Sequence, residues 1–276
     1  MMKSISSQIK QVLISGLCLI TLPLVGCNLS SDNIYKERIG WEEDFILNDD
    51  VECVKIWTYK LNSDGQPLSG ILTNTIYNFN KNGDVESVII EDHKGNIQGK
   101  TKYQYDDKQR LICELYYSDR YSSPSEKRYE YYGNVRYHRE GDMGVITSFD
   151  SDGRILSKMW IGSWGCIEPT EYNYNDKGQL ISVTSFEDTG YRDDRTLDTD
   201  GKILKQTAGY IDCAVDITYI YDSKGILVRK DIIGGGAYEG ESYIQYQEYD
   251  THNNPQIIKD TNMSRYKIIE YTYRSR

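Results

Sequence analysis

The sequence predicts an all-β protein: an antiparallel meander of about nine β-hairpin repeats that form a long twisted or curled sheet. Three observations support this class. A tight-turn motif returns every ~24 residues, a spacing that holds two ordinary strands and two turns. Polar and aromatic residues alternate before each turn, as they do on strands. Tyrosine, which suits half-buried pleated surfaces, supplies 25 of the 276 residues. No long segment carries a 3.6-residue period, so little helix is expected beyond the signal segment.

All repeats but one centre on a turn that starts with Asn or Asp and ends three residues later with glycine or a substitute; the exception is a shortened copy at Tyr131–Val135. In the stretch Tyr172–Leu180, Asn175 suits the first position of a type I turn, and Gly178 suits the left-handed position of a bulged hairpin. Gln109 and Asn253 take the place of glycine in two repeats. Asparagine tolerates the left-handed conformation better than glutamine, so Gln109 marks a weaker turn. The turn positions, 18 to 28 residues apart, are 65, 83, 109, 133, 153, 178, 201, 225 and 253.

Aromatic and aliphatic residues hold fixed places around these turns. Aromatic pairs lie six and four residues before the turn position, at Tyr77/Phe79, Tyr103/Tyr105, Tyr172/Tyr174 and Tyr219/Tyr221. An aliphatic residue lies two residues after it, at Val85, Leu111, Val135, Ile155, Leu180, Ile203 and Leu227. Alternate strand residues share a face, so the repeats predict tyrosine and aliphatic ladders across one face. Two uses of the tyrosines stay open at this point: packing of the sheet, or stacking on sugar rings.

The N-terminus carries an export pattern. Lys3 and Lys10 precede the apolar segment Gln11–Val25, which has the length of a secretory signal and is short for a membrane span. The segment ends Leu24-Val25-Gly26-Cys27, which resembles the lipobox of bacterial lipoproteins. This resemblance implies acyl chains such as palmitate on Cys27, cleavage before it, and anchoring in a bacterial envelope membrane. Asn28 after the lipidated residue favours the outer membrane.

The expected domains are a signal peptide over residues 1–26, a lipidated cysteine and polar tether over 27–50, and the repeat domain over 51–276. The tether has one apolar patch, around Trp41, Phe45 and Leu47. Whether it is a linker or a cap on the first sheet edge stays open.

The repeats resemble the RHS or YD-repeat family, whose units read roughly Tyr-Asp-x-x-Gly-x-Leu. The segment Tyr221–Leu227 is the copy most similar to that pattern. In this family the units form β-hairpins in a long curling sheet, and large members make a shell around a toxin. This chain is short and has no identifiable toxin domain, so the resemblance implies a small open or curled sheet. Tyrosine-rich repeat lipoproteins of bacteria are also similar.

Charge and motifs exclude several functions. The formal net charge is −10, and residues 1–26 hold two lysines and no acid, which leaves −12 for residues 27–276. Such a chain has no electrostatic footprint for nucleic acid. The three histidines, His93, His138 and His252, are scattered, and no catalytic set emerges. We therefore expect no metal, no cofactor and no enzymatic activity.

Four cysteines remain besides Cys18 and Cys27. An exported location permits disulfides, and four cysteines allow three pairings. The candidates are Cys53, Cys113, Cys166 and Cys213.

The turns that lead back between repeats vary in length and chemistry, and variable loops carry binding specificity in repeat proteins. The predicted binding residues on this loop edge are Tyr121, Trp160, Trp164 and Tyr238. The predicted function is a lipid-anchored, non-enzymatic envelope protein that binds or scaffolds a glycan or a protein. Two alternatives stay open: a hydrolase acting on envelope glycan, and a toxin-associated or immunity partner.

Overall fold

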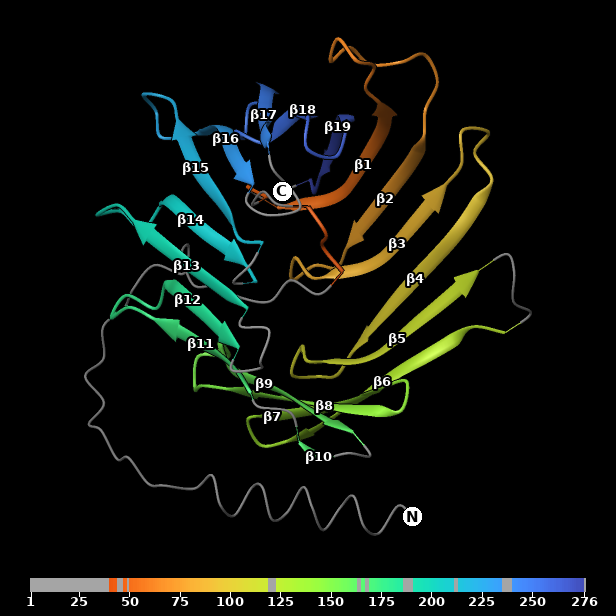
Figure 1. Cartoon of the computed structure of the whole chain (residues 1–276). Helices are drawn as coiled ribbons and strands as arrows, with labels where there is room; N and C mark the ends of the chain where they lie inside the picture. The colour runs from red at the N-terminus through yellow and green to blue at the C-terminus, as the bar shows by residue number, and fades with distance from the viewer. Residues whose placement is uncertain are drawn as a thin grey trace. The chain divides into compact units, whose positions relative to one another are not determined.

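The structure is a computed structural model, and it describes residues 40–43, 47–48, 50–118, 123–162, 165–166, 169–185, 191–210, 213–234 and 240–275. The signal peptide and Cys27 lie outside these ranges. The described chain forms one sheet of 19 strands (Figure 1). The strands in chain order are β1 (Val51–Lys60), β2 (Thr73–Phe79), β3 (Val85–Glu91), β4 (Ile97–Tyr105), β5 (Leu111–Ser118), β6 (Ser125–Tyr132), β7 (Val135–Glu140), β8 (Met143–Phe149), β9 (Ile155–Gly162), β10 (Gly165–Cys166), β11 (Thr170–Tyr174), β12 (Leu180–Ser185), β13 (Arg192–Leu197), β14 (Ile203–Gly209), β15 (Val215–Tyr221), β16 (Leu227–Gly234), β17 (Gly240–Tyr249), β18 (Pro255–Asp260) and β19 (Arg265–Tyr273).

The sheet closes on itself. Neighbouring strands pair antiparallel along the chain, and β9 pairs with β11 as well as with the two-residue β10. The last strand, β19, pairs with the first, β1, along its whole length, from Val51 opposite Tyr273 to Lys60 opposite Arg265. The result is an 18-stranded antiparallel barrel. The prediction of an all-β antiparallel meander is confirmed, and the expectation of an open sheet is wrong. Closure pairs the backbone N–H and C=O groups along the free edges of β1 and β19, which would be unpaired in an open sheet.

The turns have the predicted conformation at all nine positions. Gln109 has φ 61°, Asn253 has φ 63°, and the seven glycines have φ between 63° and 86°. The Asn or Asp that starts a turn accepts two backbone N–H groups with its side chain. Asp150 Oδ1, for example, accepts from Asp152 and Arg154 at 2.9 Å each. These carboxylates therefore satisfy backbone donors at the turn.

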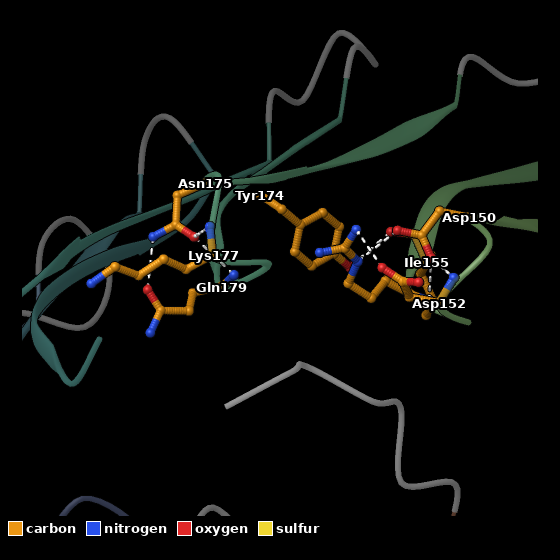
Figure 2. Close-up of polar contacts among 8 residues, drawn as sticks. Asp150, Asp152, Ile155, Tyr174, Asn175, Lys177 and Gln179 are labelled. Atoms are coloured by element: carbon orange, nitrogen blue, oxygen red, sulfur yellow. Dashed lines mark hydrogen bonds and ion pairs between the residues drawn. The ribbon is translucent and has the colours of Figure 1, made fainter. Parts of the chain in front are cut away.

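Consecutive repeats are joined by a tyrosine hydrogen bond. Tyr174 donates its hydroxyl to the carbonyl of Ile155 at 2.8 Å (Figure 2). The Arg154 guanidinium lies 5.2 Å from the Tyr174 ring centre. Arg154 Nε also contacts Asp150 at 2.5 Å. The same hydroxyl bond recurs from Tyr105, Tyr131, Tyr174, Tyr221, Tyr249 and Tyr271 to the carbonyls of Val85, Leu111, Ile155, Ile203, Leu227 and Pro255. These tyrosines serve the packing of the sheet.

A bulge after six of the turns sets which residues of the following strand face inward. On β9, Ile155 pairs with Phe149, but the next pair is Ser157 with Ser148, so the register shifts by one residue. Residues two, five and seven positions after the turn therefore share the inner wall. On β9 these are Ile155, Lys158 and Trp160.

The main apolar core lies on the inner wall of β1–β3 and β17–β19. It includes Val54, Ile56, Tyr77, Ile258 and Ile269, all buried. Of the described residues before β1, Trp41 and Leu47 pack against this core.

Several contacts hold the described residues of that segment. Trp41 lies 4.8 Å from the Tyr77 ring, and Glu43 forms a 2.6 Å ion pair with Lys267. Leu47 is buried in the core. Phe45, the third residue of the apolar patch, lies outside the described residues. The described part of the predicted tether is thus part of the barrel's packing.

Candidate binding cavity

The inner wall of β5–β9 forms a cavity of about 300 Å³. Its size is at the lower end of small-molecule sites. The lining side chains come from five consecutive strands and are Glu114, Lys127, Tyr129, Arg136, His138, Glu140, Val145, Thr147, Lys158 and Trp160.

Strand register arranges most of these side chains in two rows. The first row is aromatic and apolar in character and runs Tyr129, His138, Val145, Trp160 across β6–β9. The second row is polar and runs Tyr131, Arg136, Thr147, Lys158. The rows are two residues apart along each strand, so they are separated by about 7 Å. The cavity therefore has an aromatic side and a cationic side.

The cavity is electropositive in an acidic chain. It holds three permanent cations, Lys127, Arg136 and Lys158, against the carboxylates of Glu114 and Glu140. The Glu114 carboxylate accepts a hydrogen bond from the Tyr129 hydroxyl. These counts leave a net charge of about +1 at neutral pH when His138 is uncharged.

His138 is uncharged at neutral pH. Burial, together with the positive charges of Lys127 and Arg136, lowers its pKa from 6.5 to about 4. Its Nε2 lies 3.7 Å from the Glu140 carboxylate. The ring is therefore a neutral hydrogen-bonding group in the cavity wall.

Two buried polar atoms in the cavity wall have no hydrogen-bond partner. They are His138 Nδ1 and Thr147 Oγ1, in residues that are 6% and 0% exposed. A buried polar atom without a partner costs about 1–3 kcal/mol. Such atoms at a cavity are typical of a site whose polar groups meet a ligand.

Only one predicted binding residue falls within the described chain. Trp160 lies in the cavity, on strand β9 of the inner wall and not in a loop. Tyr121, Trp164 and Tyr238 lie outside the described residues, as does Cys27. The loop edge as a binding surface therefore stays a prediction.

The polar row was not predicted from the sequence, because only the position two residues after each turn was considered to face the inner wall. The bulge brings the fifth position to the inner wall as well. That position is apolar at Val88, Val183 and Ile258, but it is polar at Glu114, Lys158, Gln206 and Lys230. Polar residues at an inward phase are the signal that identifies this wall.

Three of the four cysteines considered for disulfides lie among the described side chains. Cys53, Cys113 and Cys213 are free thiols, so no disulfide joins any two of them. The side chain of Cys166 lies outside the described residues. Burial raises the pKa of the Cys113 thiol, which makes it less reactive. Among the described residues no group of three or more His, Cys, Asp or Glu side chains is placed to hold a metal ion.

The chain is distantly similar to several solved structures. No family model and no curated protein matches the chain. A crystal structure of TcdB2-TccC3 without its hypervariable C-terminal region is 14% identical, with a TM-score of 0.37 over 69% of this chain and 10% of that one. A Tc holotoxin pore of Photorhabdus luminescens is 11% identical, with a TM-score of 0.31 over 74% and 15%. The chain thus spans a small part of these toxin chains.

A porin-like protein from Bacteroides uniformis is 9% identical, with a TM-score of 0.31 over 82% of this chain and 98% of that one. The described residues include no helix of the length and hydropathy that a membrane span needs.

Proposed function

We propose that this chain is a lipid-anchored, non-enzymatic protein of the bacterial envelope whose barrel binds a glycan in the β5–β9 cavity. The observation that carries the proposal is Trp160 on the inner wall, in one row with Tyr129 and beside buried polar atoms. Aromatic ring faces stack on sugar rings, and neighbouring polar groups bind the hydroxyls. A flat apolar ligand would leave His138 Nδ1 and Thr147 Oγ1 without a hydrogen bond.

The lipid anchor is supported by the lipobox-like sequence and by the outer wall. Three arginine–acid pairs lie on the outward faces of β6, β13 and β16: Arg128–Glu126, Arg192–Asp194 and Arg229–Asp231. An outward Arg or Lys at the middle of a bilayer costs about 2–4 kcal/mol in a transmembrane barrel. We infer that acyl chains on Cys27 hold the protein at the membrane and that the strands stand in water.

The binding proposal is tested with the full chain purified in detergent on an array of envelope and plant-type glycans. Trp160→Ala should weaken binding to the retained glycans by about tenfold or more, the scale of a lost aromatic anchor. The matched control is Trp57→Ala, because Trp57 lies on the outward face of β1. Equal binding by both variants, or no retained glycan at all, would contradict the proposal.

The anchor is tested separately by growth with labelled palmitate. The full chain should incorporate the label, and Cys27→Ala should lose it. Label that persists in Cys27→Ala would refute the assignment.

One observation favours the hydrolase alternative: Glu114 and Glu140 both line the cavity. Two carboxylates are the usual set for cleaving a glycosidic bond. Release of reducing ends from a bound glycan by the native chain, lost in Glu140→Gln and Glu114→Gln, would establish this alternative in place of passive binding.

A further inference from the structure

The charge of the cavity is opposite to that of the protein. The whole chain has a formal charge of −10, yet Lys127, Arg136 and Lys158 outnumber the two carboxylates of the cavity wall. Nearby cations add little to the affinity for a neutral sugar. A carboxylate, in contrast, binds lysine and arginine side chains through strong charge-assisted hydrogen bonds. The three cations beside the aromatic row therefore favour a ligand that carries a negative charge.

We propose that the cavity binds an acidic saccharide, with one sugar ring on Trp160 and a carboxylate between Arg136 and Lys158. This inference rests on the proposed function and narrows it to a class of glycan. Arg136 and Lys158 flank Thr147 in the polar row, on β7 and β9. Trp160 is two residues from Lys158 on the same strand, so ring and carboxylate sites lie about 7 Å apart. That separation suits a uronic acid and its neighbouring residue in a chain.

The polar atoms fit the same ligand. Thr147 lies between the two cations in the polar row, and His138, which pairs with Val145, lies diagonally across from it in the aromatic row. The unpartnered atoms of these residues are Thr147 Oγ1 and His138 Nδ1. A sugar hydroxyl both donates and accepts, so it can pair with either atom. The neutral histidine adds no charge that would compete with the lysines for the carboxylate.

The balance of charge favours a carboxylate over a phosphate. The wall has a net charge of about +1, which matches a monoanion, whereas a phosphate monoester carries between one and two negative charges at neutral pH. The rim carboxylate Glu140, which is exposed, would repel the second charge.

The experiment is a titration of the detergent-purified full chain with tetragalacturonate and with its full methyl ester. The two probes share every ring and hydroxyl and differ in charge. We expect the acid to bind at least tenfold more tightly than the ester. Lys158→Met should reduce affinity for the acid by about tenfold and so remove most of the preference for the acid over the ester, whereas Lys158→Arg should retain the preference.

Lys205→Met is the matched control, because Lys205 is exposed on the outward face of β14. It should behave as the native chain, and circular dichroism should show that all variants keep the sheet. Equal affinity for acid and ester, with binding lost in Trp160→Ala, would overturn the acidic-ligand proposal and leave the glycan site standing. A phosphorylated sugar that binds more tightly than tetragalacturonate would also overturn it. No binding of any saccharide would contradict both proposals.

Discussion

At the scale of single residues, the left-handed turn position decides the quality of each hairpin. Gln109 holds φ 61° with a β-carbon, whereas Gly153 holds φ 79° in open space. The left-handed conformation costs a non-glycine residue about 1–2 kcal/mol. Glycine avoids this cost but loses about 0.5–1 kcal/mol more conformational entropy on folding, which offsets part of the benefit. Gln109→Gly should therefore raise the free energy of unfolding by about 0.5–1 kcal/mol.

The reciprocal change is the control for that prediction. Gly153→Gln should lower the free energy of unfolding by about 1 kcal/mol, because nothing but backbone strain opposes it. Urea titrations of the two variants measure both effects. A stabilising Gly153→Gln, or a destabilising Gln109→Gly, would show that the turn conformation does not set the cost.

His138 makes stability depend on pH. Its folded pKa of about 4 lies below the ordinary 6.5, so its contribution is fully present above pH 6.5 and is lost as pH falls toward 4. The cations Lys127 and Arg136 lower the pKa, and Glu140 opposes them. The native chain should lose about 2–3 kcal/mol more than His138→Gln between pH 6.5 and pH 4.

The measurement is a pair of urea titration series over that range. The variant serves as the control, because it keeps all other titrating groups. Parallel pH profiles for the two chains would mean that His138 accepts a proton in the folded barrel as readily as in the unfolded chain.

At the scale of elements, the tyrosine bond is the link between repeats. Tyr174 spans from one repeat to the carbonyl of Ile155 in the repeat before. Tyr174→Phe keeps the ring and its contact with Arg154 but leaves that carbonyl without the hydroxyl. The free energy of unfolding should fall by about 1 kcal/mol.

Tyr132→Phe is the matched control. The Tyr132 hydroxyl donates to Glu130, but the side chain is 44% exposed and lies on the outer wall. Its loss should cost less than 0.5 kcal/mol. Equal losses in the two variants would remove the link between repeats as a source of stability.

The hairpins could be predicted because their causes are local. Asn175 and Gly178 fix one turn, and Tyr172 and Tyr174 fix the face of the strand that enters it. The cavity could not be predicted in the same way. Lys158 faces the inner wall only because the bulge after Ile155 shifts the alternation of β9 by one residue. Arg136 lies in the same row as Lys158 only because of the register of β7 with β8 and of β8 with β9.

At the scale of the whole molecule, closure gives the sheet an inside. Every repeat pairs with its neighbours in the chain, and those pairings are the same in an open sheet and in a barrel. Only the pairing of β1 with β19 differs, and it joins residues more than 200 positions apart, such as Ile56 and Ile269. No repeat motif contains that information, and so the sequence favoured an open sheet.

Closure also explains the segment before β1. Trp41 and Leu47 are apolar residues in a polar stretch, and in the closed barrel they cover Tyr77 and its neighbours on the inner wall. The inner wall that buries them is the same wall that forms the β5–β9 cavity. A binding site inside the barrel therefore requires the β1–β19 seam.

The most direct measurement is a disulfide across that seam. Cys53 on β1 pairs with Thr272 on β19. Thr272→Cys should form a disulfide with Cys53 under mild oxidation, since paired antiparallel residues lie within the Cα separation that a disulfide needs. Arg128→Cys is the control, because its pairing with Cys113 joins neighbouring strands and does not depend on closure. Mass spectrometry of the oxidised chains should find both bridges. A bridge in the control and free thiols at Cys53 and at position 272 would contradict the closed barrel.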